Sequence, residues 1–190
     1  MEYFDEELLE AKRKLEFQKH TSLETGMYAG EELITFTYTT LEDFGIRLPL
    51  PEQMVVMPED MKNAKYPSLD APELILTDLS STVNICFNSL PVVLADEEIR
   101  SMSVQFQNAL QNMNPSIAIK NQTDTNTEQG NEMSWFEYKG YHLDGQSYNR
   151  CYLIRLRKTV LHGTFSCKLK DKDHWLDIVN KIFLAVEEIL

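Results

Sequence analysis

The sequence lacks the short motifs that mark many enzymes. It contains no glycine-rich phosphate loop, no G-x-S-x-G elbow, no H-E-x-x-H and no Cys-x-x-Cys. Only seven of its 190 residues are glycine, so backbone cradles for phosphate are scarce. We therefore expect a protein that is not an enzyme and that needs no cofactor.

An excess of basic residues is also absent. Lys and Arg together number 18 against 30 Asp and Glu, which gives a net charge of -12. Such a chain repels phosphate backbones and anionic lipid headgroups, so we expect neither nucleic acid nor a membrane as a partner. No apolar run approaches the length needed to cross a bilayer, and the first residues are acidic where a signal peptide is basic.

Cysteine is scarce, and its number is odd. Cys86, Cys151 and Cys167 lie in apolar, strand-like segments at unrelated spacings. This arrangement is typical of buried free thiols in a reducing compartment rather than of a disulfide framework. Together with the acidic start of the chain, it predicts a cytoplasmic protein.

Proline is absent after Pro115, and the proline-free segment 131–190 has the clearest pattern in the chain. It predicts three strands, the first two joined by a turn at Asp144-Gly145, followed by an amphipathic helix. The apolar positions expected on the buried face of that helix are Trp175, Ile178, Val179, Ile182, Phe183, Val186 and Ile189.

The earlier part of the chain mixes helices and strands. The spacing of Leu8, Ala11 and Leu15 predicts a helix, and the acidic residues after Ala95 suit the start of another. Consecutive strands with short turns imply an antiparallel sheet, which amphipathic helices must cover, so the predicted class is α+β. The expected segments are helices at 5–20 and 95–113, strands at 33–39, 44–50, 73–77 and 82–88, and a polar loop or hairpin tip at 121–130.

The middle of the chain gives three further expectations. Pro49 and Pro51 cannot donate ladder hydrogen bonds, so they mark an end or an edge of the strand at 44–50. The connection that follows has room for a helical turn after Pro58. In the strand at 82–88, apolar and polar residues alternate, which predicts a sheet with one wetter face.

Two groups of residues could in principle carry chemistry. Cys151 and His162 could form a thiol–imidazole pair, although a buried cysteine beside an ordinary strand histidine is far commoner. Asp171, Asp173 and His174 could bind a metal, although aspartates at the start of a helix are expected as caps. We expect core packing and capping at these places, and no catalytic or metal site.

Two other groups favour binding. Met54, Met57 and Tyr66 lie in the proline-punctuated middle of the chain, where methionine side chains adapt to varied partners or fill gaps in a core. Arg155 and Arg157 interrupt an apolar strand, where they could receive an acidic partner or form internal salt bridges. These five are the candidate partner-binding residues, and the expected partner is another protein.

Several short segments, taken in their order, also resemble a known family. The segments are Phe44-Gly45-Ile46-Arg47-Leu48-Pro49, Pro51-Glu52-Gln53-Met54, the helix from Ala95 to Met113, Trp135-Phe136-Glu137-Tyr138, Asp144-Gly145-Gln146, Tyr152-Leu153-Ile154 and the helix from Trp175 to Ile189. Together they resemble the PsbP-like, or Ran-binding Mog-like, fold, particularly the DcrB-related bacterial domain of unknown function.

The resemblance implies an antiparallel sheet between helices, an α/β/α sandwich of the PsbP-like type, that docks proteins and has no shared catalytic residues. Residues 1–40 depart from the pattern, so we expect an N-terminal helix-and-strand extension followed by a PsbP-like domain over residues 41–190. The implied role is a non-enzymatic protein-binding, adaptor or chaperone-like one. The alternatives are a small hydrolase or transferase with a carboxylate- or thiol-based site, and an immunity protein.

Overall fold

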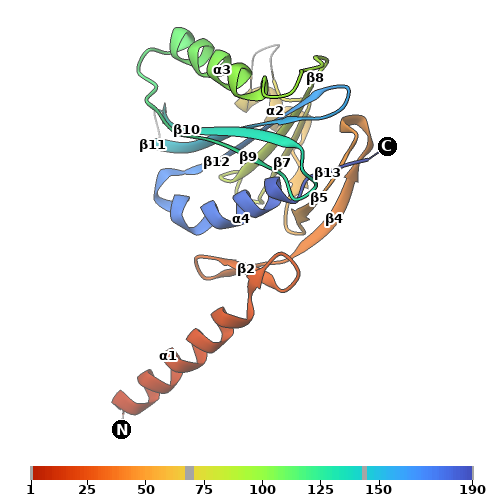
Figure 1. The fold of residues 1–190 in the computed structure, drawn as a ribbon. Helices are drawn as coiled ribbons and strands as arrows, with labels where there is room; N and C mark the ends of the chain where they lie inside the picture. The colour runs from red at the N-terminus through yellow and green to blue at the C-terminus, as the bar shows by residue number, and fades with distance from the viewer. Residues whose placement is uncertain (1, 67–70, 143–144, 190) are drawn as a thin grey trace.

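A computed structural model describes residues 2–66, 71–142 and 145–189 (Figure 1). The helices are α1 (Glu2–Lys19), α2 (Glu59–Lys65), α3 (Ile99–Met113) and α4 (Lys172–Leu184). The strands are β1 (Thr21–Ser22), β2 (Gly26–Ala29), β3 (Glu32–Ile34), β4 (Phe36–Leu41), β5 (Ile46–Pro51), β6 (Val55–Val56), β7 (Leu74–Thr77), β8 (Asn84–Leu90), β9 (Ile119–Asn126), β10 (Glu132–His142), β11 (Gly145–Arg155), β12 (Val160–Lys168) and β13 (Glu187–Glu188).

A seven-stranded antiparallel sheet forms the centre of the protein. Its strand order is β6-β7-β8-β12-β11-β10-β9. From β9 to β12, each strand pairs with the next one in the sequence, as expected for antiparallel strands joined by short turns. This arrangement, with helices on both faces, confirms the predicted α+β class (Figure 1).

Helix α4 covers one face of this sheet. Apolar residues recur on it at helical spacing, and Ile178, Val179, Ile182 and Phe183 are fully buried, with Trp175 nearly so. The ring of Phe183 stacks on Tyr152 with 3.9 Å between centroids. The same ring lies over Gly163, where an added Cβ would come within 2.2 Å of it. The close approach of α4 to β12 therefore requires glycine at this position.

Helices α3 and α2 lie on the opposite face and cover it only in part. Leu153 and Val160 are buried there together with Ile99, the first residue of α3. Nearer the other edge, Met57 is buried against Ile75 and Cys86, next to α2. Helix α2 confirms the short helix expected after Pro58.

A smaller sheet, of order β13-β5-β4, packs beside α4 and contributes Ile46 and Leu48 to the main core. Pro49 and Pro51 lie in β5 beyond the short reach of β13, which pairs only with residues 46 and 47. Their missing N–H groups therefore cost no ladder hydrogen bond, as the sequence predicted. The expected domain boundary at residue 40 falls inside β4, and the core includes Met27 and Ile34 from before it.

Three details of the sequence prediction are wrong. The terminal helix ends at Leu184, and residues 187–188 form β13. Residues 127–130 of the segment expected as a loop or hairpin tip do lie in the turn between β9 and β10, but residues 121–126 belong to edge strand β9, whose polar side chains are tolerated because most of them remain exposed. Asp171 is at the N-cap position of α4 but makes no side-chain capping hydrogen bond. The predicted turn at Asp144 lies outside the described residues.

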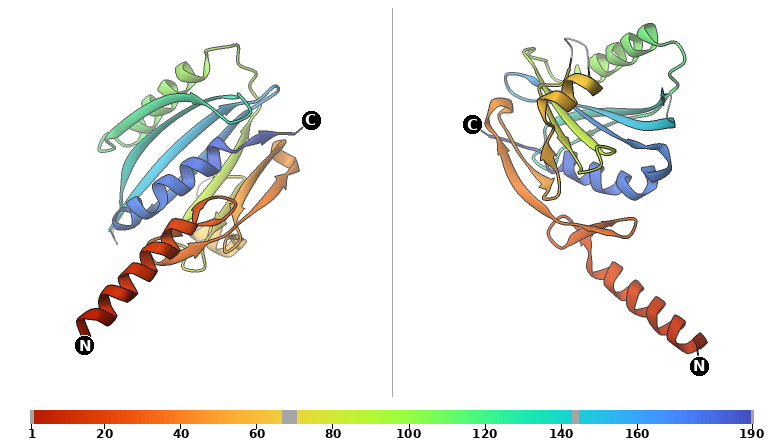
Figure 2. Two further views of the ribbon diagram at one scale, coloured as in Figure 1. Left: turned by 60° about the horizontal axis from the view of Figure 1, so that its bottom comes forward. Right: turned by 180° about the vertical axis from the view of Figure 1, so that it is seen from behind.

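Helix α1 projects away from the rest of the protein (Figure 2). Contacts with the body are made near its C-terminal end, where Phe17 packs against Tyr28 and Arg13 pairs with Glu31. None of the helices in the described part of the chain is long and apolar enough to cross a membrane.

Candidate functional site

A row of polar side chains crosses the partly covered face of the central sheet. Asn84 on β8 is directly opposite Ser166 on β12, and Ser166 is directly opposite Asn149 on β11. Because side chains alternate along a strand, all three project from the face opposite α4. Asn84 accepts a hydrogen bond from Thr77 (3.0 Å) and donates one to Ser166 (3.3 Å). This row confirms the wetter face that the alternation in β8 predicts.

This polar row forms part of the wall of a groove of about 920 Å³. The groove lies beyond the end of α2, where β8 and β11 begin and β12 ends. Its volume is near the upper end of the range usual for ligand sites, and most of its lining residues are polar. The described lining residues are Lys65, Tyr66, Ser81, Thr82, Asn84, Gly145, Gln146, Ser147, Asn149, Ser166, Cys167, Lys168, Leu169 and Lys170.

Three lysines and no acidic residue are among those described lining residues. The Nζ atom of Lys65 donates a hydrogen bond to the carbonyl oxygen of Ser81 at 2.7 Å. Lys168 and Lys170 are exposed and make no ion pair with any described residue. In a protein of net charge -12, this groove is therefore a local concentration of positive charge, which attracts anionic groups.

The three candidate residues that come from the middle of the chain lie in three different environments. Tyr66 is half-buried and lines the groove, and burial, with the neighbouring Cys86 thiol, raises the pKa of its hydroxyl. Met57 is only 3% exposed and belongs to the core, so it offers no surface to a partner. Met54 packs against the main core and lines a different, smaller cavity of about 250 Å³ near His174.

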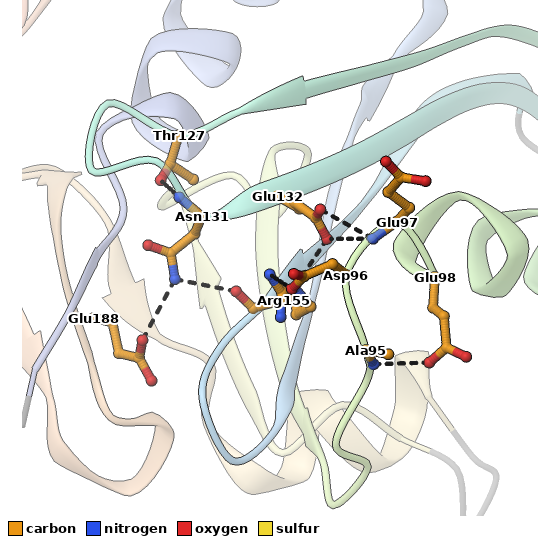
Figure 3. Close-up of polar contacts among 9 residues, drawn as sticks. All are labelled: Ala95, Asp96, Glu97, Glu98, Thr127, Asn131, Glu132, Arg155 and Glu188. Atoms are coloured by element: carbon orange, nitrogen blue, oxygen red, sulfur yellow. Dashed lines mark hydrogen bonds and ion pairs between the residues drawn. The ribbon is translucent and has the colours of Figure 1, made fainter.

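Arg155 lies at the opposite end of β11 and is held by acidic neighbours (Figure 3). Its guanidinium forms ion pairs with Asp96 at 2.8 Å and with Glu132 at 2.9 Å. Glu132 also accepts a hydrogen bond from the backbone N–H of Glu97 at 3.0 Å. Arg155 therefore ties the segment before α3 to β10, which is the internal salt bridge that the sequence left open.

Hydrogen bonds beside these ion pairs connect Arg155 to Glu188 in the C-terminal strand β13 through Asn131 (Figure 3). Asn131 donates hydrogen bonds to the carbonyl oxygen of Arg155 (3.0 Å) and to Glu188 (3.4 Å). Glu188 also accepts a bond from the backbone N–H of Arg157 at 2.8 Å. Arg157 lies beyond the end of β11 and pairs with Glu188 at 3.7 Å. Both arginines therefore form internal salt bridges, one of the two readings that the sequence left open.

The structure does not assemble a thiol-based site from the cysteines that it describes. All three are free and buried, as the sequence predicted. Burial raises the pKa of the Cys151 thiol, and it lowers the pKa of His162 to about 4. Both groups are therefore neutral near pH 7, whereas a nucleophilic cysteine requires the thiolate. His162 instead contacts the ring of Phe106 and the side chain of Asn88.

Sequence reasoning missed a buried charged cluster on the α4 face. Glu137 and Arg150 lie directly opposite each other on β10 and β11, and both are at most 6% exposed. A guanidinium nitrogen of Arg150 lies 3.3 Å from a carboxylate oxygen of Glu137, and the Cζ atom of Arg150 lies 4.0 Å from the centroid of the Trp135 ring. The opposite charges at matching strand positions are a usable signal, but only once the register of the two strands is known.

Sequence reasoning also missed Lys168 and Lys170. They follow the last apolar residue of β12, where charged residues usually mark the end of a strand. Their relevance depends on Lys65 and Asn84, which are distant in sequence and come together only in the folded sheet.

No protein-family model matches this chain, and no curated protein matches it either. Solved structures do. The solution structure of cyanobacterial PsbP (CyanoP) from Synechocystis sp. has a TM-score of 0.58 at 10% identity, over 84% of this chain and 95% of that one. The fold is PsbP-like.

A second solved structure agrees with this assignment. LpqN, described as involved in cell envelope biogenesis of Mycobacterium tuberculosis, has a TM-score of 0.50 at 14% identity, over 80% of this chain and 90% of that one. A Pseudomonas aeruginosa protein of unknown function, with a TM-score of 0.45 at 13% identity over 78% of this chain and 94% of that one, carries no argument. At these identities the likeness establishes the PsbP-like fold alone, and the groove has to be interpreted from its own residues.

Proposed function

We propose that this protein is a non-enzymatic binding domain that holds an acidic, extended segment of another polypeptide in the lysine-lined groove. The observation that carries the proposal is the charge of the groove: three lysines and no acid among its described lining residues, in a strongly acidic protein. A clustered positive potential of this kind steers oppositely charged partners and raises their association rate.

The polar groups of the groove favour a polypeptide over a compact inorganic anion. Hydroxyl and amide side chains such as Ser166, Asn149 and Gln146 offer both donors and acceptors, which main-chain N–H and C=O groups of an extended segment require. A groove of about 920 Å³ also exceeds what a single phosphate or small carboxylate would fill. Tyr66 adds an aromatic surface for an apolar side chain of the segment.

The proposal keeps the protein-binding role inferred from the sequence but moves its site. Tyr66 remains a candidate contact, whereas Lys168 and Lys170 replace Arg155 and Arg157 as its basic residues. The cytoplasmic location and the narrower relation to the DcrB-related domain stay predictions from the sequence.

Charge reversal in the groove tests the proposal. A fluorescently labelled peptide with alternating glutamate and apolar residues should bind the native protein, and added salt should weaken the complex because exposed charges are screened. The double variant Lys168→Glu/Lys170→Glu should bind the peptide at least about tenfold more weakly. Lys158→Glu is the matched control, because Lys158 is an exposed lysine roughly 25 Å away at the other end of β12.

Fluorescence anisotropy measures the affinity, and thermal unfolding checks that each variant is folded. Equal binding by the native protein and the groove variant would contradict the proposal. So would binding of phosphate or citrate, but not of the peptide, since the groove would then be a site for small anions.

A further inference from the structure

Helix α1 carries an apolar stripe that is exposed in the described part of the chain. Leu8 and Leu15 are 48% and 58% exposed, and Ala11 between them is exposed as well. The helix has 18 residues and projects from the body along most of its length (Figure 2). Most helix stability in proteins comes from packing of an amphipathic face rather than from intrinsic propensity, and this stripe has no such packing among the described residues.

The spacing of the stripe is that of a coiled coil. Leu8, Ala11 and Leu15 follow one another at intervals of three and four residues, which places Leu8 and Leu15 at a positions and Ala11 at the d position of a heptad. Such a stripe is narrow, as expected for a seam that faces one other helix. Phe17 lies off this seam and packs against Tyr28 of the same chain.

The charges of α1 indicate that the helix facing this stripe is α1 of a second copy of the chain. Its N-terminal half, EYFDEELLE, contains five acidic residues and no basic one, whereas the following AKRKLEFQK contains four basic residues and one acidic one. Two copies in antiparallel orientation bring each acidic half against a basic half. Two parallel copies would instead place like charges side by side along the whole length.

In the antiparallel arrangement, individual side chains across the seam also complement each other in size and charge. With Leu8 of one copy opposite Ala11 of the other, a large side chain meets a small one in both central layers. Glu7 and Lys14, both at g positions, then lie across the seam from each other in the two copies. Neither residue has an ion pair with a described residue of its own chain. Because the body is attached at the C-terminal end of α1, the two bodies lie at opposite ends of the pair and do not collide.

We propose that α1 is a self-association helix, which joins two copies of this chain through an antiparallel two-stranded coiled coil. The two-fold axis crosses the helix pair between Leu8 and Ala11. The dimer carries the two lysine-lined grooves on separate bodies, so the inference is independent of what the grooves bind.

Sedimentation of the full-length chain over a range of concentrations tests this inference. The native protein should pass from monomer to dimer as its concentration rises. Leu8→Glu should raise the midpoint concentration at least about tenfold, because it puts a charge into the seam. Leu9→Glu is the matched control: Leu9 is 65% exposed but lies one position outside the seam, so its midpoint should stay unchanged.

A charge exchange tests the orientation. Glu7→Lys and Lys14→Glu should each raise the midpoint, and the double variant Glu7→Lys/Lys14→Glu should restore it toward the native value. Circular dichroism checks that the variants retain their helix. A protein that remains monomeric at every concentration would overturn the inference. A dimer that Leu8→Glu leaves intact, or a double variant weaker than both single ones, would overturn it too.

Discussion

The two faces of the central sheet use polar residues in opposite ways. On the face that α4 covers, Glu137 and Arg150 pair with each other, and Arg150 also donates hydrogen bonds to Tyr148 and Tyr152. On the other face, the row that contains Ser166 opens into a groove whose described lining residues include three lysines and no acidic residue. Polar groups that are closed off by their own chain specify the fold, whereas those left open are available to another molecule.

The open face repeats this contrast between its two ends. At the end near α3, Arg155 is neutralised by Asp96 and Glu132. At the other end, Lys168 and Lys170 make no ion pair with a described residue. Basic residues at the two ends of this face thus differ in whether their charge is paired within the described part of the chain. Substitutions in the two kinds of environment should therefore affect stability or binding, but not both.

The largest effect is expected at Glu137, on the closed face. Glu137→Gln leaves Arg150 buried without its counter-charge, which should cost about 3–5 kcal/mol of unfolding free energy. Glu137→Leu/Arg150→Met removes both charges and should cost less than the single change. Urea unfolding measures these values, and peptide binding by the folded fraction should be unaffected. A double variant less stable than Glu137→Gln would show that the ion pair is itself strongly stabilising.

The same residue should make the fold sensitive to acid. Burial opposes ionisation of Glu137, but hydrogen bonds from Tyr148, Asn121 and Arg150 outweigh it and lower the pKa of its carboxyl. The stability that the ionised form provides is therefore present above the ordinary carboxyl range and is lost as the pH falls through the lowered pKa. Glu137→Gln should show a flatter loss of stability in that acid range.

A smaller effect is expected from His162. Burial lowers its pKa from 6.5 to about 4, so between these values the unfolded chain binds a proton that the folded chain does not. Stability is then complete above pH 6.5 and should fall by roughly 1–3 kcal/mol as the pH drops toward 4. His162→Gln should remove most of this dependence in urea unfolding. An unchanged slope would mean that His162 is protonated in the folded protein.

The smallest effect is expected at Arg155. Its ion pairs are partly exposed, so Arg155→Ala should cost only about 1 kcal/mol in thermal or urea unfolding. Binding of the acidic peptide should be unchanged, because the groove lies at the other end of β11. If Arg155→Ala weakens the peptide complex as much as charge reversal at Lys168 and Lys170, the contrast between the two ends fails and the residue predicted from the sequence is a contact after all.

Much of the fold could be predicted from the sequence because it depends on local patterns. The helical spacing of Trp175, Ile178 and Ile182 specified a buried face, and the alternation in β8 specified one wetter face of a sheet. The prediction failed at chain segments that are decided by pairing. Polar residues 121–126 form a strand because β10 offers hydrogen bonds to them, and residues 187–188 leave the helical path to pair with β5.

The candidate site could be predicted only in part. Tyr66 was identified from the sequence and lines the groove, but Met57 became part of the core and Arg155 was taken up by internal ion pairs. A single residue's type indicates what it can bind, not whether its own chain has already occupied it.

The sequence by itself determined the α+β class, the acidic surface, the buried thiols and the amphipathic faces, since these follow from composition and from periods of two or 3.6 residues. Only the tertiary structure decided which charges remain open. Lys65 and Lys168 are about a hundred residues apart in the chain, yet both line one groove. Lys65, at the end of α2, donates a hydrogen bond to the carbonyl of Ser81 shortly before β8, and β8 is the neighbour of β12. Strand order and register bring such residues together, and neither is written in any local pattern.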